Sequence, residues 1–155
     1  LVKASLYAAF GNKRQMYLKA LDRYETVMVD PGCELLRDKT QPPEQRLRVF
    51  FSLPISAVKD NRDLRGCFLC NASADQASID PEIAETVQRG YLKLQDALVD
   101  AIREMGAMSQ MAKSKAALAM ATYTGLRVMA RSGTPVPTLE LARDGVLQTL
   151  CWAEQ

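Results

Sequence analysis

The chain has 155 residues, of which 48% are hydrophobic and 25% are charged, and it contains no histidine. This length favours one domain with a sizeable core, and the lack of histidine excludes Ser-His and Cys-His catalysis and the most common metal ligand. No apolar run approaches the ~18–20 residues that a membrane span needs, and no signal peptide opens the chain, so we expect a cytoplasmic protein without a membrane partner.

The net charge of +2 is unevenly distributed along the chain. Residues 1–25 hold five basic and two acidic groups, a net +3, which leaves 15 basic and 16 acidic groups, a net −1, for the rest. A positive end on a near-neutral body favours an anionic partner at that end. Chance clustering on a solvated helix face explains the charge equally well.

The helical period begins at the first segment, where a short opening helix precedes Asn12. Asn12 can cap the next helix, with Gln15 three residues on as its capping-box partner. We expect this second helix to end at Pro31-Gly32. Its apolar face consists of Met16, Ala20, Leu21, Tyr24, Val27 and Met28.

A third helix is expected to begin at Gln41-Pro42-Pro43 and to kink at Pro54, because Pro54 cannot donate a hydrogen bond to the carbonyl of Phe50. The charged segment 59–65 predicts a loop. A short helix from Cys67 to about Ala77 follows it.

Asp80-Pro81 predicts the start of the most amphipathic helix, with an N-cap and a proline at the first helical position. Its apolar residues recur at steps of three and four, and Gly106 ends it. Two further helices are expected, over about 111–131 and from Thr134 or Thr138 to Trp152. No segment shows sustained strand-like alternation, so the sequence predicts an all-α bundle.

The segment from Ser5 to Tyr24, SLYAAFGNKRQMYLKALDRY, resembles the end of the helix-turn-helix and the start of the next helix in the TetR family of bacterial transcriptional regulators. The matching positions, with the family's spacing, are Leu6, Tyr7, Phe10 and Lys13. Two later segments also resemble the family: RGCFL at 65–69 with Asn71, and GLRVMARSG at 125–133. The resemblance therefore spans essentially the whole chain.

The resemblance implies a TetR-like, all-α bundle with two parts. Residues 1–25 would be the end of a helix-turn-helix DNA-binding domain and the start of the connecting helix, and 26–155 a ligand-binding and dimerisation domain. The chain starts at the recognition helix, without the two helices that precede it in the family. We therefore expect a truncated or partly ordered form of a longer protein, which as it stands binds DNA weakly or not at all.

The function that the resemblance implies is that of a ligand-responsive repressor, a homodimer that binds a palindromic double-stranded DNA operator and is released by a small, largely apolar effector. Lys13 and Arg14 support this, because they occupy the first turn of a helix, where the helix dipole disfavours cations unless an anion such as phosphate is bound. The DNA-binding residues expected are Lys3, Ala4 and Ser5 at the groove, with Tyr7, Lys13 and Arg14 at the backbone.

The middle helices are expected to enclose the effector pocket, since methionine and aromatic side chains suit an adaptable apolar cavity. The predicted lining is Phe50, Phe51, Phe68, Tyr91, Leu94, Met105, Met120 and Tyr123, with Asn71 and Asp75 as polar contacts. Plain core packing is the alternative for each of these side chains.

The family pairs its last two helices with those of a second copy. The predicted interface consists of the small residues Ala117, Ala121 and Gly125 and of the stripe Leu139, Ala142, Val146 and Leu150. The alternative is that both stripes face the chain's own core.

Cys67 and Cys70 form a CxxC motif, for which inert core thiols, an oxidation sensor and half of a metal site are all open. We predict no catalytic residue, no metal and no cofactor.

Two other functions compete with the repressor: a dimeric helical ligand-binding protein without DNA contact, and a small helical enzyme. An enzyme would need converging carboxylates or a reactive lysine. The row Asp96, Asp100 and Glu104 lies beside the apolar face of its helix, which predicts a solvated flank.

Overall fold

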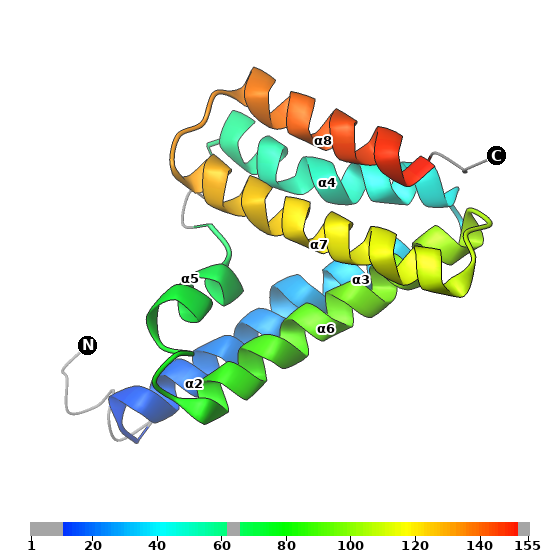
Figure 1. Cartoon of the computed structure of the whole chain (residues 1–155). Helices are drawn as coiled ribbons and strands as arrows, with labels where there is room; N and C mark the ends of the chain where they lie inside the picture. Colours follow the sequence, from blue (N-terminus) through cyan, green and yellow to red (C-terminus); the bar gives the residue numbers. More distant parts are fainter. Residues whose placement is uncertain (1–10, 62–65, 152–155) are drawn as a thin grey trace.

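The computed structural model describes residues 11–61 and 66–151 of the chain. All regular structure within these ranges is helical, which confirms the all-α prediction (Figure 1). The elements are α2 (Lys13–Tyr24), the π-helical turn η1 (Glu25–Val29), α3 (Asp30–Arg37), α4 (Pro43–Lys59), α5 (Phe68–Asp75), α6 (Pro81–Glu104), α7 (Ser109–Arg131) and α8 (Val136–Cys151). Within the described ranges, no helix combines the length and apolarity needed to cross a membrane.

The first three elements follow one another without a break and form what we call the composite helix, residues 13–37. Asn12 caps it as predicted, since its side chain accepts from the backbone N–H of Gln15, whose side chain accepts in return from the N–H of Asn12. The predicted end at Pro31-Gly32 is wrong. In η1 the Asp30 N–H bonds to the carbonyl of Glu25, five residues back, and this wider turn precedes the proline, which lacks an N–H to donate.

The composite helix and α6 lie side by side and run in the same direction (Figure 1). Ion pairs join them along their length, and each paired residue of the composite helix has its partner on or at the start of α6, 63 to 68 positions later. The pairs are Arg14 with Asp80 and Glu82, Asp22 and Glu25 with Arg89, Glu25 and Asp30 with Lys93, and Arg37 with Asp100. A constant offset of this kind is what parallel helices produce.

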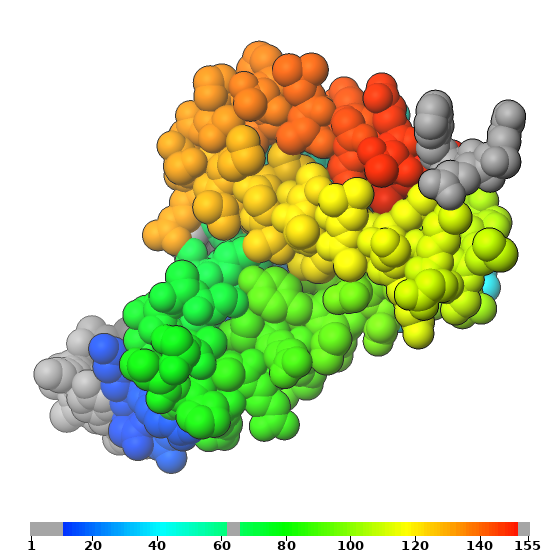
Figure 2. Space-filling model, in the orientation of Figure 1, coloured from blue at the N-terminus to red at the C-terminus, as the bar shows by residue number. Residues whose placement is uncertain are grey.

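The helices α4, α7 and α8 form the other part of the bundle, in which α8 packs on both α4 and α7. Helix α4 continues through Pro54, which is buried. Asp80 caps α6 as predicted, through hydrogen bonds from the N–H groups of Glu82 and Ile83. Helices α7 and α8 are visible side by side in Figure 2, in yellow and in orange to red.

One arginine is buried in the core near the end of α6. The Arg46 side chain is 1% exposed, donates to the carbonyl of Leu36 at 2.6 Å, and pairs with Glu104. The prediction of a solvated flank holds for Asp96, Asp100 and Glu104, which are all exposed. Glu104 has an additional role that the sequence did not indicate, because its carboxylate balances the buried charge of Arg46.

Candidate ligand pocket and nucleic-acid face

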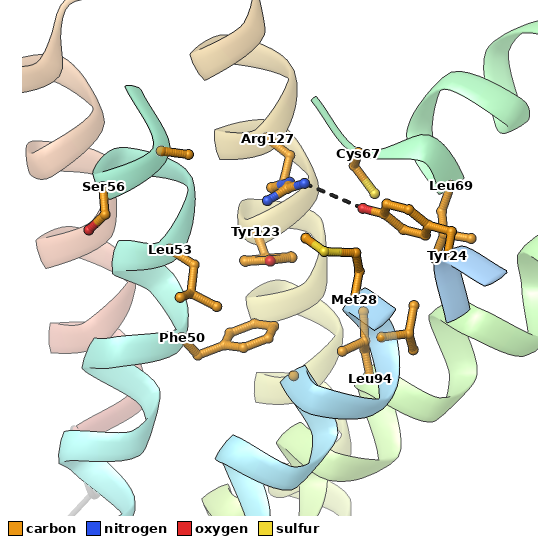
Figure 3. Close-up of a pocket in the computed structure, with 13 residues that line it drawn as sticks. Tyr24, Met28, Phe50, Leu53, Ser56, Cys67, Leu69, Leu94, Tyr123 and Arg127 are labelled. Atoms are coloured by element: carbon orange, nitrogen blue, oxygen red, sulfur yellow. Dashed lines mark hydrogen bonds between the residues drawn. The ribbon is translucent and has the colours of Figure 1, made fainter. Parts of the chain in front are cut away.

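A cavity of about 260 Å³ lies between the composite helix and the helices α4, α6 and α7 (Figure 3). This is slightly below the ~300–1,000 Å³ of sites for drug-sized ligands, so it suits a small molecule. Its wall comprises Tyr24, Met28, Val29 and Gly32 from the composite helix, Phe50, Leu53, Ser56 and Ala57 from α4, Cys67 and Leu69 at α5, Leu94 from α6, and Tyr123 and Arg127 from α7.

Aromatic rings make up one side of the cavity. Phe50 and Tyr123 stack with ring centroids 4.2 Å apart and an interplanar angle of 24°. Phe51 lies behind them, fully buried, with its ring edge-on to both. Such ring pairs prefer fixed geometries, so this side of the cavity is preformed.

Arg127 is the charged member of the cavity wall. Its guanidinium donates to the hydroxyl of Tyr24 at 3.3 Å and to the carbonyl of Gly66 at 3.0 Å, and no carboxylate occurs among the described lining residues. Burial raises the pKa of Tyr24 and raises that of Tyr123 to about 12, so both hydroxyls stay protonated near neutral pH. The wall of the cavity is therefore mainly apolar and contains one cationic side chain, Arg127.

Of the ten predicted pocket residues, Phe50, Leu94 and Tyr123 lie on this wall. The other seven do not line this cavity. Phe51 lies against the aromatic stack, Phe68 packs on Tyr17 and Tyr24, and Met120 is buried in α7. Asn71 accepts a hydrogen bond from Arg131, and Tyr91 lies beside Ser73. Asp75 is exposed, and Met105 is the C-cap of α6. The assignment of these seven residues to an effector pocket stays a prediction, and this cavity does not include them.

Sequence reasoning missed the other wall residues, of which Tyr24, Met28 and Arg127 are the most informative. Tyr24 and Met28 were placed on the apolar face of their helix without being assigned to the pocket. Arg127 carried a usable signal, because it is a cation inside an otherwise uncharged stretch, residues 116–130. A buried charge in such a stretch points to a specific polar neighbour or ligand.

The π-helical turn carries Met28 and Val29 to the cavity and is held against α6 by Glu25. The Glu25 carboxylate accepts from Arg89 at 2.9 Å and pairs with Lys93 at 2.5 Å. Burial would raise the pKa of Glu25, but the hydrogen bonds from Lys93 and Arg89 outweigh it and lower the pKa below its usual value. Single π-turns inside α-helices occur often at functional sites.

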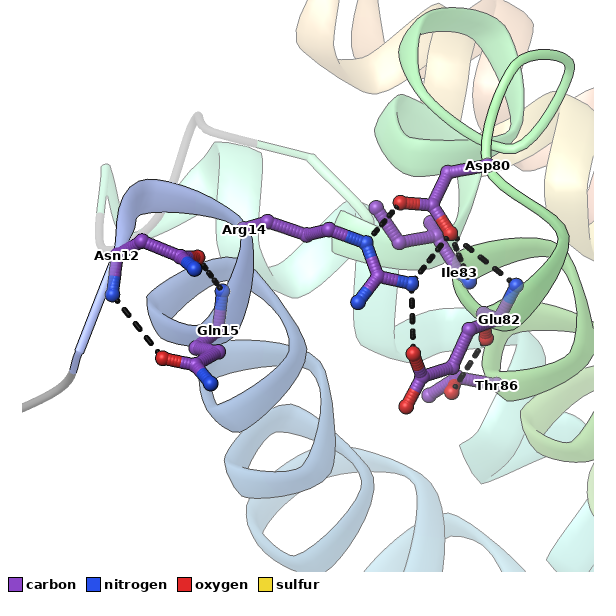
Figure 4. A network of polar contacts seen from close by, with 7 residues as sticks. All are labelled: Asn12, Arg14, Gln15, Asp80, Glu82, Ile83 and Thr86. Atoms are coloured by element: carbon purple, nitrogen blue, oxygen red, sulfur yellow. Dashed lines mark hydrogen bonds and ion pairs between the residues drawn. The ribbon is translucent and has the colours of Figure 1, made fainter.

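The predicted DNA-binding residues fall into three groups. Lys3, Ala4, Ser5 and Tyr7 lie outside the described residues. Lys13 is exposed in the first turn of α2. Arg14 is instead engaged within the chain, at 2.5 Å from Asp80 and 2.6 Å from Glu82 (Figure 4).

The charge of Arg14 therefore needs no phosphate to balance it, which corrects the argument made from the helix dipole. Asp80 and Glu82 stand at the start of α6, beside the start of α2, and neutralise the cation there. Hydrogen bonding from Arg14 accordingly lowers the pKa of the Asp80 carboxyl. The argument remains in force for Lys13 alone.

The predicted dimer residues divide between two faces. Ala117 and Ala121 are exposed on α7, and a Cβ added at Gly125 would meet nothing within 4 Å. On α8 the stripe formed by Leu139, Val146 and Leu150 is buried within the chain and Ala142 is half-buried. Leu139, Val146 and Leu150 therefore face the chain's own core, which is the alternative stated for this stripe, while Ala142 stays partly accessible.

Comparison with known proteins identifies the class as transcriptional regulators. Residues 43–144 match the TetR-type family described as "Transcriptional regulator LmrA/YxaF-like, C-terminal domain". The chain is also 25% identical, over 100 residues, to the uncharacterized HTH-type transcriptional regulator YezE of Bacillus subtilis (strain 168). That match covers 63% of this chain and 50% of YezE, so the chain spans about half the length of that relative.

The family match covers most of the chain, and the chain therefore belongs to the TetR family of transcriptional regulators. Its matched part is an LmrA/YxaF-like C-terminal domain. No solved structure matches the chain.

The ion pairs of Glu25 give a pH-dependent prediction. With its folded pKa lowered, the carboxylate adds stability at neutral pH that is fully present above the unfolded value of ~4.3 and is lost as pH falls through the folded pKa. Glu25→Gln should cost about 1–2 kcal/mol at pH 7, because two charge-assisted hydrogen bonds are weakened, and less at pH 3, where the wild-type carboxylate is closer to its folded pKa. Urea unfolding at both pH values measures the difference.

Glu85→Gln is the matched control, since Glu85 is exposed on α6. It should change the unfolding free energy by less than about 0.5 kcal/mol at either pH. An equal cost of Glu25→Gln at pH 7 and pH 3 would show that the ion pairs do not stabilise the π-turn.

Proposed function

We propose that the protein is a TetR-type ligand-responsive repressor, a homodimer that binds a palindromic operator and releases it when a small, largely apolar ligand occupies the cavity. The observation that carries the proposal is that one unbroken helix, 13–37, supplies both Lys13 and a wall of the cavity. A molecule bound there touches the same rigid element that continues toward the DNA-binding segment. Residues 26–155 would then form the ligand-binding and dimerisation domain.

The ligand would act through Tyr24 and Met28. Both side chains lie on the cavity wall at the junction of α2 with the π-turn, where the backbone hydrogen bonds change spacing. A packed helix moves as a unit, so a small displacement there is carried to Lys13 at its beginning. In a dimer, opposite displacements of two heads would change the spacing of recognition helices that must meet half-sites ~34 Å apart.

The chemistry of the ligand follows from the wall. Met28, Leu53 and Leu94 suit an apolar or aromatic body, while Arg127 suits a single anionic or hydrogen-bond-accepting group. The effector is thus still expected to be largely apolar, but with one group that accepts a hydrogen bond from Arg127.

The dimer would form through the outward face of α7 and the neighbouring surface of α8. The small residues Ala117, Ala121 and Gly125 permit a close approach of two helices. Large apolar side chains are also exposed on these helices, Leu118 and Val128 on α7 and Leu141 on α8. A two-fold contact between such faces buries them all at once.

One alternative function has a specific observation in its favour. Arg14 is bound within the chain, which removes one of the two cations expected at the DNA, and a dimeric ligand-binding protein without DNA contact would need neither. Operator binding by the complete protein separates the two functions.

For operator binding we predict the effect of Lys13→Ala in the complete protein, on a duplex selected from a random pool. Affinity should fall about 3- to 10-fold, and the slope of log K against log salt should decrease by roughly two, one phosphate for each protomer. Lys113→Ala, which removes an exposed lysine from α7, should leave both unchanged. Absence of salt-sensitive affinity for any duplex would favour the ligand-binding alternative.

For the ligand we predict that 1-anilinonaphthalene-8-sulfonate, an aromatic anion, binds the cavity and lowers operator affinity. Arg127→Gln should raise its dissociation constant about 10- to 100-fold, because a charge-assisted hydrogen bond is lost. Arg131→Gln serves as control, since Arg131 is exposed one turn further along α7. Fluorescence titration measures binding, and equal dissociation constants for wild type and Arg127→Gln contradict the assignment.

For the dimer we predict that Ala121→Arg raises the dimer dissociation constant by at least about 100-fold. Two symmetry-related cations would meet at the centre of the contact, and like charges there cost several kcal/mol. Gln88→Arg places the same charge on the exposed side of α6 and should leave the dimer intact. Sedimentation equilibrium measures both, and an unchanged dimer of Ala121→Arg rules out this face.

A further inference from the structure

The CxxC motif stands at the first turn of α5. Cys67 is the N-cap, with extended backbone angles of φ −92° and ψ 125°, and Cys70 is the third residue of the helix. Both thiols are free. Cys67 is 8% exposed and lines the cavity, which gives small molecules access to its sulfur, and Cys70 is half-buried.

The surroundings of Cys67 favour a thiolate. The Cys70 thiol donates toward its sulfur and lowers its pKa, against the effect of burial, and the Tyr24 hydroxyl, the Cys70 backbone N–H and the Arg127 cation act in the same sense. An N-cap position adds the positive end of the helix dipole. The pKa of Cys70 is raised by the same contact, so the pair holds one nucleophilic sulfur beside one protonated thiol.

The two residues between the cysteines, Phe68 and Leu69, join this turn to the neighbouring helices. Phe68 packs edge-on against the rings of Tyr17 and Tyr24 on α2, with centroids 5.2 and 5.9 Å apart. On the other side Leu69 fits against Gly90 of α6 so closely that an added Cβ would lie 2.9 Å from its Cδ1. A change in the first turn of α5 therefore displaces Phe68 more easily than Leu69.

We propose that Cys67 and Cys70 form an oxidisable dithiol that responds to hydrogen peroxide by closing a disulfide and shifting Phe68 against α2. The Cys67 thiolate attacks one peroxide oxygen, the O–O bond breaks, and the other oxygen leaves as hydroxide. The sulfur, now a sulfenic acid, is attacked by Cys70, whose proton leaves with the displaced oxygen as water. In total two thiols and one peroxide give one disulfide and two waters.

Closing the disulfide replaces the hydrogen bond between the two sulfur atoms by a covalent bond of ~2.05 Å, so the sulfurs move toward each other. Because Phe68 directly follows Cys67, a shift of the backbone at this N-cap moves Phe68 relative to Tyr17 and Tyr24. Only the consequence for the operator depends on the proposed repressor function, whereas the disulfide and the movement of α2 do not.

The experiment treats the chain with hydrogen peroxide, blocks free thiols with iodoacetamide and digests with trypsin. Cys67 and Cys70 share the peptide 66–89, which should lose two hydrogen atoms and resist alkylation. Cys33 is an internal control, because it is buried in peptide 24–37 and burial raises its pKa. Amide exchange in α2 should become about 2- to 10-fold faster on oxidation, the size expected for lost aromatic contacts.

Cys70→Ser separates the chemistry from the movement. It should stop oxidation at a Cys67 sulfenic acid, trapped by dimedone, with no change in the exchange of α2. Peptide 66–89 that remains fully alkylated while exposed Cys151 is oxidised overturns the dithiol. A disulfide that forms with α2 exchange unchanged overturns the coupling, and neither result bears on whether the complete protein binds an operator.

Discussion

The parallel packing of the composite helix on α6 is the constraint on which the rest of this structure depends. Apolar side chains such as Leu21, Leu36 and Leu98 supply most of the stabilisation, since each is fully buried. Several ion pairs along the seam join side chains that are about half exposed, and these contribute little energy one by one, whereas the carboxylate of Glu25 is 11% exposed. Their contribution is to the register, because sliding α6 along the composite helix would disturb all of these pairs together. That register fixes where the π-turn meets the cavity.

Tyr24 is the point at which the parts of the molecule meet. Its ring contacts Phe68 of α5, its hydroxyl accepts from Arg127 of α7, and it lies on the cavity wall at the end of α2. A ligand in the cavity and a change at the Cys67–Cys70 turn would therefore act on the same side chain. Two chemically different signals can thus bias one helix without any longer path between them.

Helix boundaries could be predicted from the sequence because they depend on local chemistry, as the caps at Asn12 and Asp80 illustrate. The continuation of the helix past Pro31 could not be predicted, since it follows a π-turn whose Glu25 pairs with Arg89 and Lys93 of α6, a contact between distant parts of the chain. The surroundings of the apolar stripe on α8 could not be predicted for a different reason. An apolar stripe marks the side of a helix that is buried, but it does not distinguish burial in the chain's own core from burial against a partner. Leu139 and Leu150 are buried in the chain's own core.

The two cations at the start of α2 show that charge and position in the sequence do not by themselves identify a phosphate-binding residue. The same dipole argument applies to Lys13 and Arg14, yet only Arg14 reaches Asp80, which also caps α6. Asp80 thereby ties the beginnings of both helices together, so that α2 enters the bundle at a fixed angle. A phosphate at Lys13 would then meet a helix already held in place, and its binding would cost little ordering. Preorganisation of this kind makes the position of α2, rather than its charge, the quantity that a ligand or a disulfide has to change.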